Sequence, residues 1–283
     1  HLSRGVRVGI HAPWVSHLLF ADDCLVCTQA TVEAATRLHN ILDIYKTASG
    51  QMVNRSKSAI FFSANCNDET KAMVHVNIEI ETEALVEKYL GLPTAIGKSF
   101  DVQFEHIATN IRKLVNGCVP KLLSSAAREV LIKAVCQAIP NYSMSCFRLS
   151  KKLCKKLTNI VARFFWGGDD NKRKLHWKKW KDIAMPKGEG GMGFRDFELF
   201  NQAMLAKQGW RLLTSPDSLC ARVLKGKYYH DHEFMSAKNK RGSSHIWRAI
   251  LHGREGLKLG LIKRVGDGSS IHPWEDPWIP FNH

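Results

Sequence analysis

The spacing of apolar residues changes along the chain, and each spacing predicts a different kind of element. In residues 14–27, two short apolar runs are separated by the adjacent acids Asp22 and Asp23, a pattern typical of a β-hairpin with the acids at its turn. Apolar residues then recur every three or four positions between Thr31 and Gly50, which predicts a helix that should pack on the sheet. The apolar run 59–62 predicts a further strand.

Helical periodicity dominates from residue 101 onward. It predicts three amphipathic helices, over 101–117, from Ser124 or Ser125 toward Pro140, and from Ser150 to residue 164. Helices of this kind form a small bundle. The fold class expected for the whole chain is therefore α+β, with a mainly helical second part.

Glycines and polar residues follow the third predicted helix, and tryptophans follow them. We expect a linker near Gly167 and Gly168, and three segments overall: 1–99, 100–168 and 169–283. The tryptophans beyond residue 165 are interleaved with Lys and Arg, which fits either core anchors or base stacking, and the core interpretation is favoured. Gly188–Gly193 lacks the flanking residues of a phosphate loop and predicts a flexible turn.

Composition narrows the class of protein. Of the 283 residues, 45% are hydrophobic, which is enough for a buried core. No apolar run approaches the roughly 18 to 20 residues of a membrane span, so we expect no membrane segment. The eight cysteines are scattered, which favours a reducing, intracellular compartment. Cys24 and Cys27 form a lone CxxC, for which a core position is favoured over a metal site.

Positive charge is concentrated in the second part of the chain. The net charge is +15, yet residues 1–100 hold nine Lys and Arg against ten acids. Residues 151–181 hold eleven Lys and Arg against two acids, which predicts affinity for a polyanion such as nucleic acid. A merely solvated helix face is the alternative. The candidate phosphate-binding residues are Lys151, Lys152, Lys155, Lys156, Lys178 and Lys179.

The acids at the predicted hairpin turn allow two interpretations. Aspartate favours turns because its side chain bonds its own backbone, so Asp22 and Asp23 need no further role. Two carboxylates on a stiff hairpin also suit Mg²⁺, a cation that prefers oxygen ligands and keeps substrate phosphates in its shell. The histidine and acid cluster His230-Asp231-His232 is left unassigned, as a surface loop.

Several motifs together carry a resemblance to a known family. The segment HLLFADD at 17–23, then ASGQMVNRSKSAIFFS at 48–63 and KYLGLPTAIGKS at 88–99, stand in the order and spacing of reverse transcriptases from plant LINE-type (non-LTR) retrotransposons. The similarity continues through FFWGG at 164–168, HWKKWKDIAMPKGEGGMGFRD at 176–196 and FNQAMLAKQGWRLL at 200–213. It covers nearly the whole chain, but only the C-terminal part of the polymerase, from the palm hairpin through the thumb.

The resemblance implies an RNA-directed DNA polymerase that uses two Mg²⁺ ions for nucleotidyl transfer. Asp22 and Asp23 would be catalytic metal ligands, Phe20 would pack beside the primer end, and Lys57 would lie near the incoming triphosphate. The primer-holding hairpin would contain Leu90, Gly91 and Leu92. One departure is Arg55, where family members commonly carry an apolar or small residue.

The implied partners are an RNA template and an RNA–DNA or DNA duplex, and the implied location is nuclear. The family supplies a further metal-binding carboxylate and the fingers upstream of residue 1, so we expect a fragment that does not polymerise alone. A nucleic-acid-binding remnant without catalysis, or a helical interaction module, are the alternatives.

Overall fold

The chain is divided between two units, each built from two stretches of sequence. One comprises His1–Ala95 with Asp217–Phe234, and the other comprises Ile96–Pro216 with Met235–His283. The computed structural model describes residues 5–83, 88–93, 100–118, 123–168, 174–269, 271–274 and 277–279. In these ranges helices outnumber strands and the strands form two small antiparallel sheets, so the α+β expectation is confirmed. The boundaries expected at 99 and 168 stay a prediction.

The predicted hairpin is present in the first unit. Strand β1 (His17–Phe20) pairs antiparallel with β2 (Asp23–Val26), and Phe20 lies opposite Asp23. Ala21 and Asp22 form the two-residue loop, in which Ala21 has a φ of 49°. A positive φ at the first loop position matches the twist of the flanking strands.

The first predicted helix also has the expected ends. Helix α1 spans Val32–Ser49, and the backbone N–H of Ala34 donates to Thr31 Oγ1 at 3.2 Å. Gly50 follows the helix with a φ of 72°, the left-handed conformation that glycine adopts at little cost. Local sequence therefore sets both ends of this helix.

The packing partner of α1 differs from the expectation. It packs chiefly against α2 (Asp68–Ile78), which the sequence pattern did not predict. Their shared core contains Ala35, Phe62, Val74, Ile78 and Ile80. The strand predicted at 59–62 is wrong, because only Ile60 forms a single bridge, in which its N–H donates to the Thr82 carbonyl at 2.9 Å.

Three short elements and one helix complete the first unit. They are the 3₁₀ turn η1 (Arg55–Lys57), the strands β3 (Lys88–Tyr89) and β4 (Leu92–Pro93), and helix α9 (Leu219–Tyr228). A Cβ at Gly226 of α9 would lie 2.4 Å from the Ala12 backbone nitrogen. Glycine is needed there because the α9 backbone packs directly on the segment before the β1–β2 hairpin.

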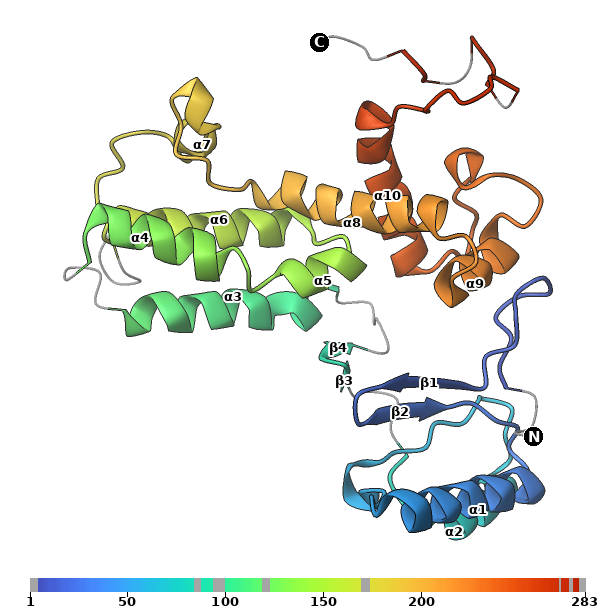
Figure 1. Ribbon diagram of the computed structural model, residues 1–283. Coiled ribbons are helices and arrows are strands. Elements are labelled where there is room, and N and C mark those ends of the chain that lie inside the picture. The colour runs from blue at the N-terminus through green and yellow to red at the C-terminus, as the bar shows by residue number, and fades with distance from the viewer. Residues whose placement is uncertain are drawn as a thin grey trace. The chain divides into compact units, whose positions relative to one another are not determined.

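The predicted bundle is present in the second unit. Helices α3 (Phe100–Gly117) and α4 (Ser125–Leu131) both pack on α6 (Lys151–Phe165), and a π-helical turn, η2 (Ile132–Cys136), continues α4 (Figure 1). Ser124 and Ser150 are the N-caps, as expected. The core of the bundle consists of fully buried apolar residues that include Phe104, Ile111, Ile132, Leu157 and Val161.

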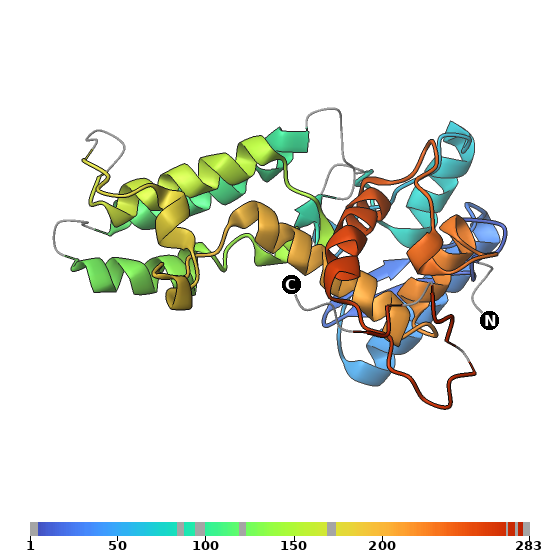
Figure 2. The same ribbon diagram turned by 90° about the horizontal axis from the view of Figure 1, so that it is seen from above.

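The other helices of the second unit were not expected from the sequence. They are α5 (Asn141–Cys146), α7 (Trp180–Ala184), α8 (Phe197–Thr214) and α10 (His245–Gly260), with 3₁₀ turns η3 (Lys187–Glu189) and, at the junction of the units, η4 (Phe234–Ser236). Helix α10 crosses α8 closely (Figure 2), and a Cβ at Gly253 would lie 2.3 Å from the Leu205 carbonyl carbon. No helix in the described ranges is both long and apolar enough to cross a membrane.

We expected the tryptophans beyond residue 165 to lie in the core. This expectation is wrong for most of those that the structure describes. Trp247 of α10 is fully buried, but Trp177 is 78% exposed and Trp274 is 98% exposed. Trp210 is also exposed. Burial of a tryptophan depends on tertiary contacts, which the spacing of residues along the chain does not report.

Candidate functional site

The acids of the β1–β2 hairpin face solvent. Asp22 lies in the two-residue loop and Asp23 is the first residue of β2, and both are exposed. Neither carboxylate forms an ion pair with another described residue, so both are open to a ligand. Phe20 and Leu19 precede them and are 61% and 68% exposed, so an apolar surface adjoins the acids.

The carboxylates of Asp22 and Asp23 are suitable ligands for a hard cation, but they are too few to hold one alone. Two carboxylates provide oxygen ligands of the type that Mg²⁺ takes, and Mg²⁺ completes its shell with water and substrate phosphates. Among the residues that the structure describes, no group of three His, Cys, Asp or Glu side chains could hold a metal ion. The hairpin therefore presents two carboxylates, and a metal site there would need further ligands.

Lys57 ends the 3₁₀ turn η1 and is exposed. Its backbone N–H donates to Asn54 Oδ1 at 3.2 Å, which fixes the backbone of the turn. The neighbouring Arg55 pairs with Glu79, the C-cap residue that follows α2. Arg55, where the resemblance leads us to expect an apolar or small residue, thus forms a surface ion pair.

The β3–β4 hairpin contains the other residues expected at the primer. Leu90 and Gly91 form its loop, with φ values of 50° and 77°, and Tyr89 lies opposite Leu92. Positive φ at both loop positions is typical of a two-residue hairpin. A leucine in this conformation costs about 1–3 kcal/mol, so the closing pair of the hairpin must hold Leu90 in place.

Basic residues gather in a groove between α3 and α6 of the second unit. Its cavity has a volume of about 310 Å³. We call it the α3/α6 groove, and it is lined by Arg112, Lys152, Lys155, Lys156, Asn159, Ile160 and Arg163. Lys156 also pairs with Glu105 of α3, which ties the two helices together. Such a row of cations suits a chain of phosphates.

Some of the lysines predicted from the sequence to bind phosphate line this groove, and others do not. Lys152, Lys155 and Lys156 lie in it, whereas Lys151 pairs with Glu198 of α8 at 3.2 Å. Arg112 was missed, because it comes from a different helix and only the fold brings it to α6. The spacing of Lys152, Lys156 and Arg163 along one helix face is the signal that sequence alone offered.

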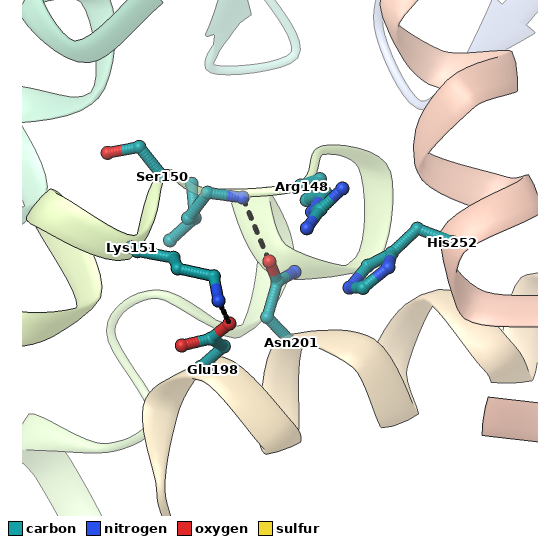
Figure 3. A pocket seen from close by; sticks show the side chains of 7 residues that line it. Arg148, Ser150, Lys151, Glu198, Asn201 and His252 are labelled. Atoms are coloured by element: carbon teal, nitrogen blue, oxygen red, sulfur yellow. Dashed lines mark hydrogen bonds and ion pairs between the residues drawn. The ribbon is translucent and has the colours of Figure 1, made fainter. Parts of the chain in front are cut away.

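Lys151 instead lines a second cavity of about 180 Å³, formed where α6, α8 and α10 meet. Figure 3 shows Arg148, Glu198, Asn201 and His252 around it. Burial, and then the charge of Arg148, lower the pKa of His252 from its ordinary value. The imidazole is therefore held toward its neutral form.

Asn201 is the best-connected side chain of this cavity. It accepts a hydrogen bond from the Leu149 backbone N–H at 2.8 Å and donates to the carbonyls of Met144 and Phe147 at 2.8 and 2.9 Å. The side chain is almost fully buried. It thereby fixes the path of the chain from α5 into α6, just before the basic residues.

The remaining metal candidates are not supported by their surroundings. Cys24 is exposed and Cys27 is half-buried, against the expectation of a core position, and partial removal from water raises the pKa of both thiols. His230 stacks on His11 with ring centroids 4.1 Å apart, and Asp231 lies 3.0 Å from His232. Asp231 is thus paired within its loop, and His230 contacts a ring of the segment that precedes β1.

Two proteins of the plant Arabidopsis thaliana are similar in sequence to this chain. No family model matches the chain. It is 46% identical over 143 residues to an "Uncharacterized mitochondrial protein" of Arabidopsis thaliana, a match that covers 50% of this chain and 93% of that protein. It is 35% identical over 181 residues to a "Putative ribonuclease H protein" of the same plant, a match that covers 62% of this chain and 29% of that protein.

Proposed function

The chain belongs to the same family as the uncharacterized mitochondrial protein of Arabidopsis thaliana, and we propose that it derives from the polymerase of a plant LINE-type retrotransposon. It would correspond to the palm hairpin, the primer-holding hairpin and the thumb of an RNA-directed DNA polymerase. The observation that carries this proposal is the pair of exposed, adjacent carboxylates at the turn of a tight hairpin, next to an exposed phenylalanine.

The ribonuclease H name of the second relative supports only the substrate class. That protein is named for an activity on nucleic acid, and this chain matches 29% of its length. We therefore carry over nucleic acid as the substrate and not the hydrolytic activity. The basic α3/α6 groove supports the same substrate class from the structure.

Each predicted site residue of the first unit has a role in this proposal. Asp22 and Asp23 would hold Mg²⁺, which when bound activates the primer hydroxyl and neutralises phosphate charge. Lys57 would donate a proton or a hydrogen bond to the leaving pyrophosphate. Phe20 would pack against the primer terminus, and Leu90, Gly91 and Leu92 would hold the primer strand.

The α3/α6 groove would hold the backbone of the RNA–DNA or DNA duplex. Lys152, Lys155 and Arg112 line it from two helices, so phosphates in the groove meet cations on both walls. Affinity from such contacts arises from released counterions and falls steeply with salt. A nucleic-acid-binding protein without catalysis is the second candidate, because this groove needs no contribution from Asp22 or Asp23.

Primer extension tests the catalytic part. On a primed RNA template with Mg²⁺, we expect no incorporation by these 283 residues, because two carboxylates leave the two-metal site incomplete. In a polymerase that carries the complete set of carboxylates, Asp22→Asn should abolish extension while Asp43→Asn, on α1, should leave it. Extension that survives Asp22→Asn would exclude the proposed role, and incorporation by the chain alone would contradict the incomplete site.

A further inference from the structure

The segment that precedes α7 is held against the second unit by two aromatic contacts. His176 stacks on Trp166 at the end of α6, with ring centroids 6.0 Å apart and an interplanar angle of 24°. Trp180 stacks on the buried Phe194 at 4.8 Å and 23°. Residues 177–179 are therefore a short stretch between two fixed points.

Trp177 lies between these anchors and faces solvent. Its side chain is 78% exposed, whereas an indole ring ordinarily contributes a large buried area to a core or an interface. The neighbouring Leu175 is 70% exposed. A large aromatic ring held outward by a fixed backbone is available for a ligand that stacks.

The charge around Trp177 indicates the chemistry of that ligand. Lys178 and Lys179 follow directly and are exposed, and Lys174 precedes the segment. The other highly exposed tryptophan, Trp274, is followed in sequence by Glu275 and Asp276. Among the described tryptophans that are more than half exposed, Trp177 is the one with adjacent positive charge, which is complementary to a base and its phosphate.

We propose that Trp177, Lys178 and Lys179 form a binding site for single-stranded nucleic acid. An unpaired base would stack on the indole ring and the adjoining phosphates would contact the two ammonium groups. A duplex would gain less, because its bases already stack on one another and expose only their edges. The site goes beyond the proposed polymerase function, since it uses neither the Asp22 hairpin nor the α3/α6 groove.

Fluorescence anisotropy with labelled oligonucleotides tests this site. The probe is a dT strand of about ten nucleotides, within the length range that single-strand sites cover, and the comparison is a blunt duplex of the same length. We expect Trp177→Ala to weaken binding of the dT strand by about tenfold or more and to leave duplex binding within about twofold. Trp177→Phe should restore much of the affinity, because a smaller ring still stacks.

Two matched variants separate the roles of ring and charge. Trp274→Ala removes an even more exposed tryptophan that acids follow in sequence, and it should leave dT binding unchanged. Lys178→Gln with Lys179→Gln should reduce the slope of log affinity against log salt by up to about 1.4, or about 0.7 for each lost phosphate contact. Lys178, Lys179 and Trp274 are all exposed, so none of these substitutions disturbs the core.

The outcomes also distinguish this site from the duplex groove. Lys152→Gln with Lys155→Gln should weaken duplex binding and spare the dT strand. Unchanged dT binding by Trp177→Ala, or equal losses on both probes, would overturn the proposal. The proposal would also be overturned if Trp177→Ala lost binding to anionic lipid vesicles and kept dT binding. That result would assign the exposed ring to a membrane surface instead.

Discussion

Phe20 and Asp23 face each other across the β1–β2 hairpin as its last paired residues. This register leaves only Ala21 and Asp22 for the loop, so two carboxylates and an aromatic ring are held within four consecutive residues. A hairpin has little freedom at its closing pair, because turn type and loop length fix the register. The acids are therefore presented on a stiff support.

Asn201 should contribute strongly to the stability of the second unit. Asn201→Ala removes the partners of the Leu149 N–H and of the Met144 and Phe147 carbonyls in a buried position. Leaving such groups unpaired should lower the free energy of unfolding by about 3 kcal/mol. Urea denaturation followed by circular dichroism measures this change.

The control for that experiment is Asn159→Ala, on the exposed face of α6. It should change the free energy of unfolding by less than about 0.5 kcal/mol. Equal effects of the two substitutions would show that Asn201 does not fix the chain between α5 and α6.

The α3/α6 groove predicts which lysines contribute to duplex binding. Lys152→Gln with Lys155→Gln should reduce the slope of log affinity against log salt by up to about 1.8, since each lost phosphate contact on a duplex is worth about 0.9. Lys151→Gln is the matched control, because Lys151 pairs with Glu198 outside the groove. A slope that changes as much with Lys151→Gln would assign the affinity to general charge.

His252 should make the second unit sensitive to acid. Burial and the charge of Arg148 lower its pKa, and Lys151 acts in the same direction, while Glu198 and Glu255 act against them. Because the folded state then binds the proton less readily than the unfolded state, stability is present above the ordinary histidine pKa of about 6.5 and is lost as the pH falls below it.

The measurement is the midpoint of thermal unfolding for the native protein and for His252→Gln between about pH 7 and pH 5. The native midpoint should fall more than that of the variant over this range. Parallel curves would mean that His252 has the same proton affinity in both states.

Local sequence determined the parts of the fold that were predicted correctly. Thr31, Ser124 and Ser150 each cap a helix through a side-chain oxygen, and Gly50 ends one with a positive φ. These signals act within a few residues, so they can be recognised without knowledge of the rest of the chain. The hairpin at Asp22 was found for the same reason.

The parts that were missed depend on distant residues. The run 59–62 has strand-forming residues but gains only the bridge between Ile60 and Glu83, because a strand needs a partner along its length. Arg112 reaches the basic groove only through the packing of α3 on α6. Helix α8 is the exception, because its N-cap Asp196 is a local signal that the sequence contains.

Paramagnetic broadening by Mn²⁺ tests most directly whether Asp22 and Asp23 together hold a divalent metal. In amide NMR spectra of the chain, we expect Mn²⁺ to broaden the signals of residues 20–24 first and excess Mg²⁺ to restore them. Asp22→Asn with Asp23→Asn should remove the effect. Broadening that begins instead at the acids Asp68 and Glu69 of α2, or that survives the double substitution, would contradict the account.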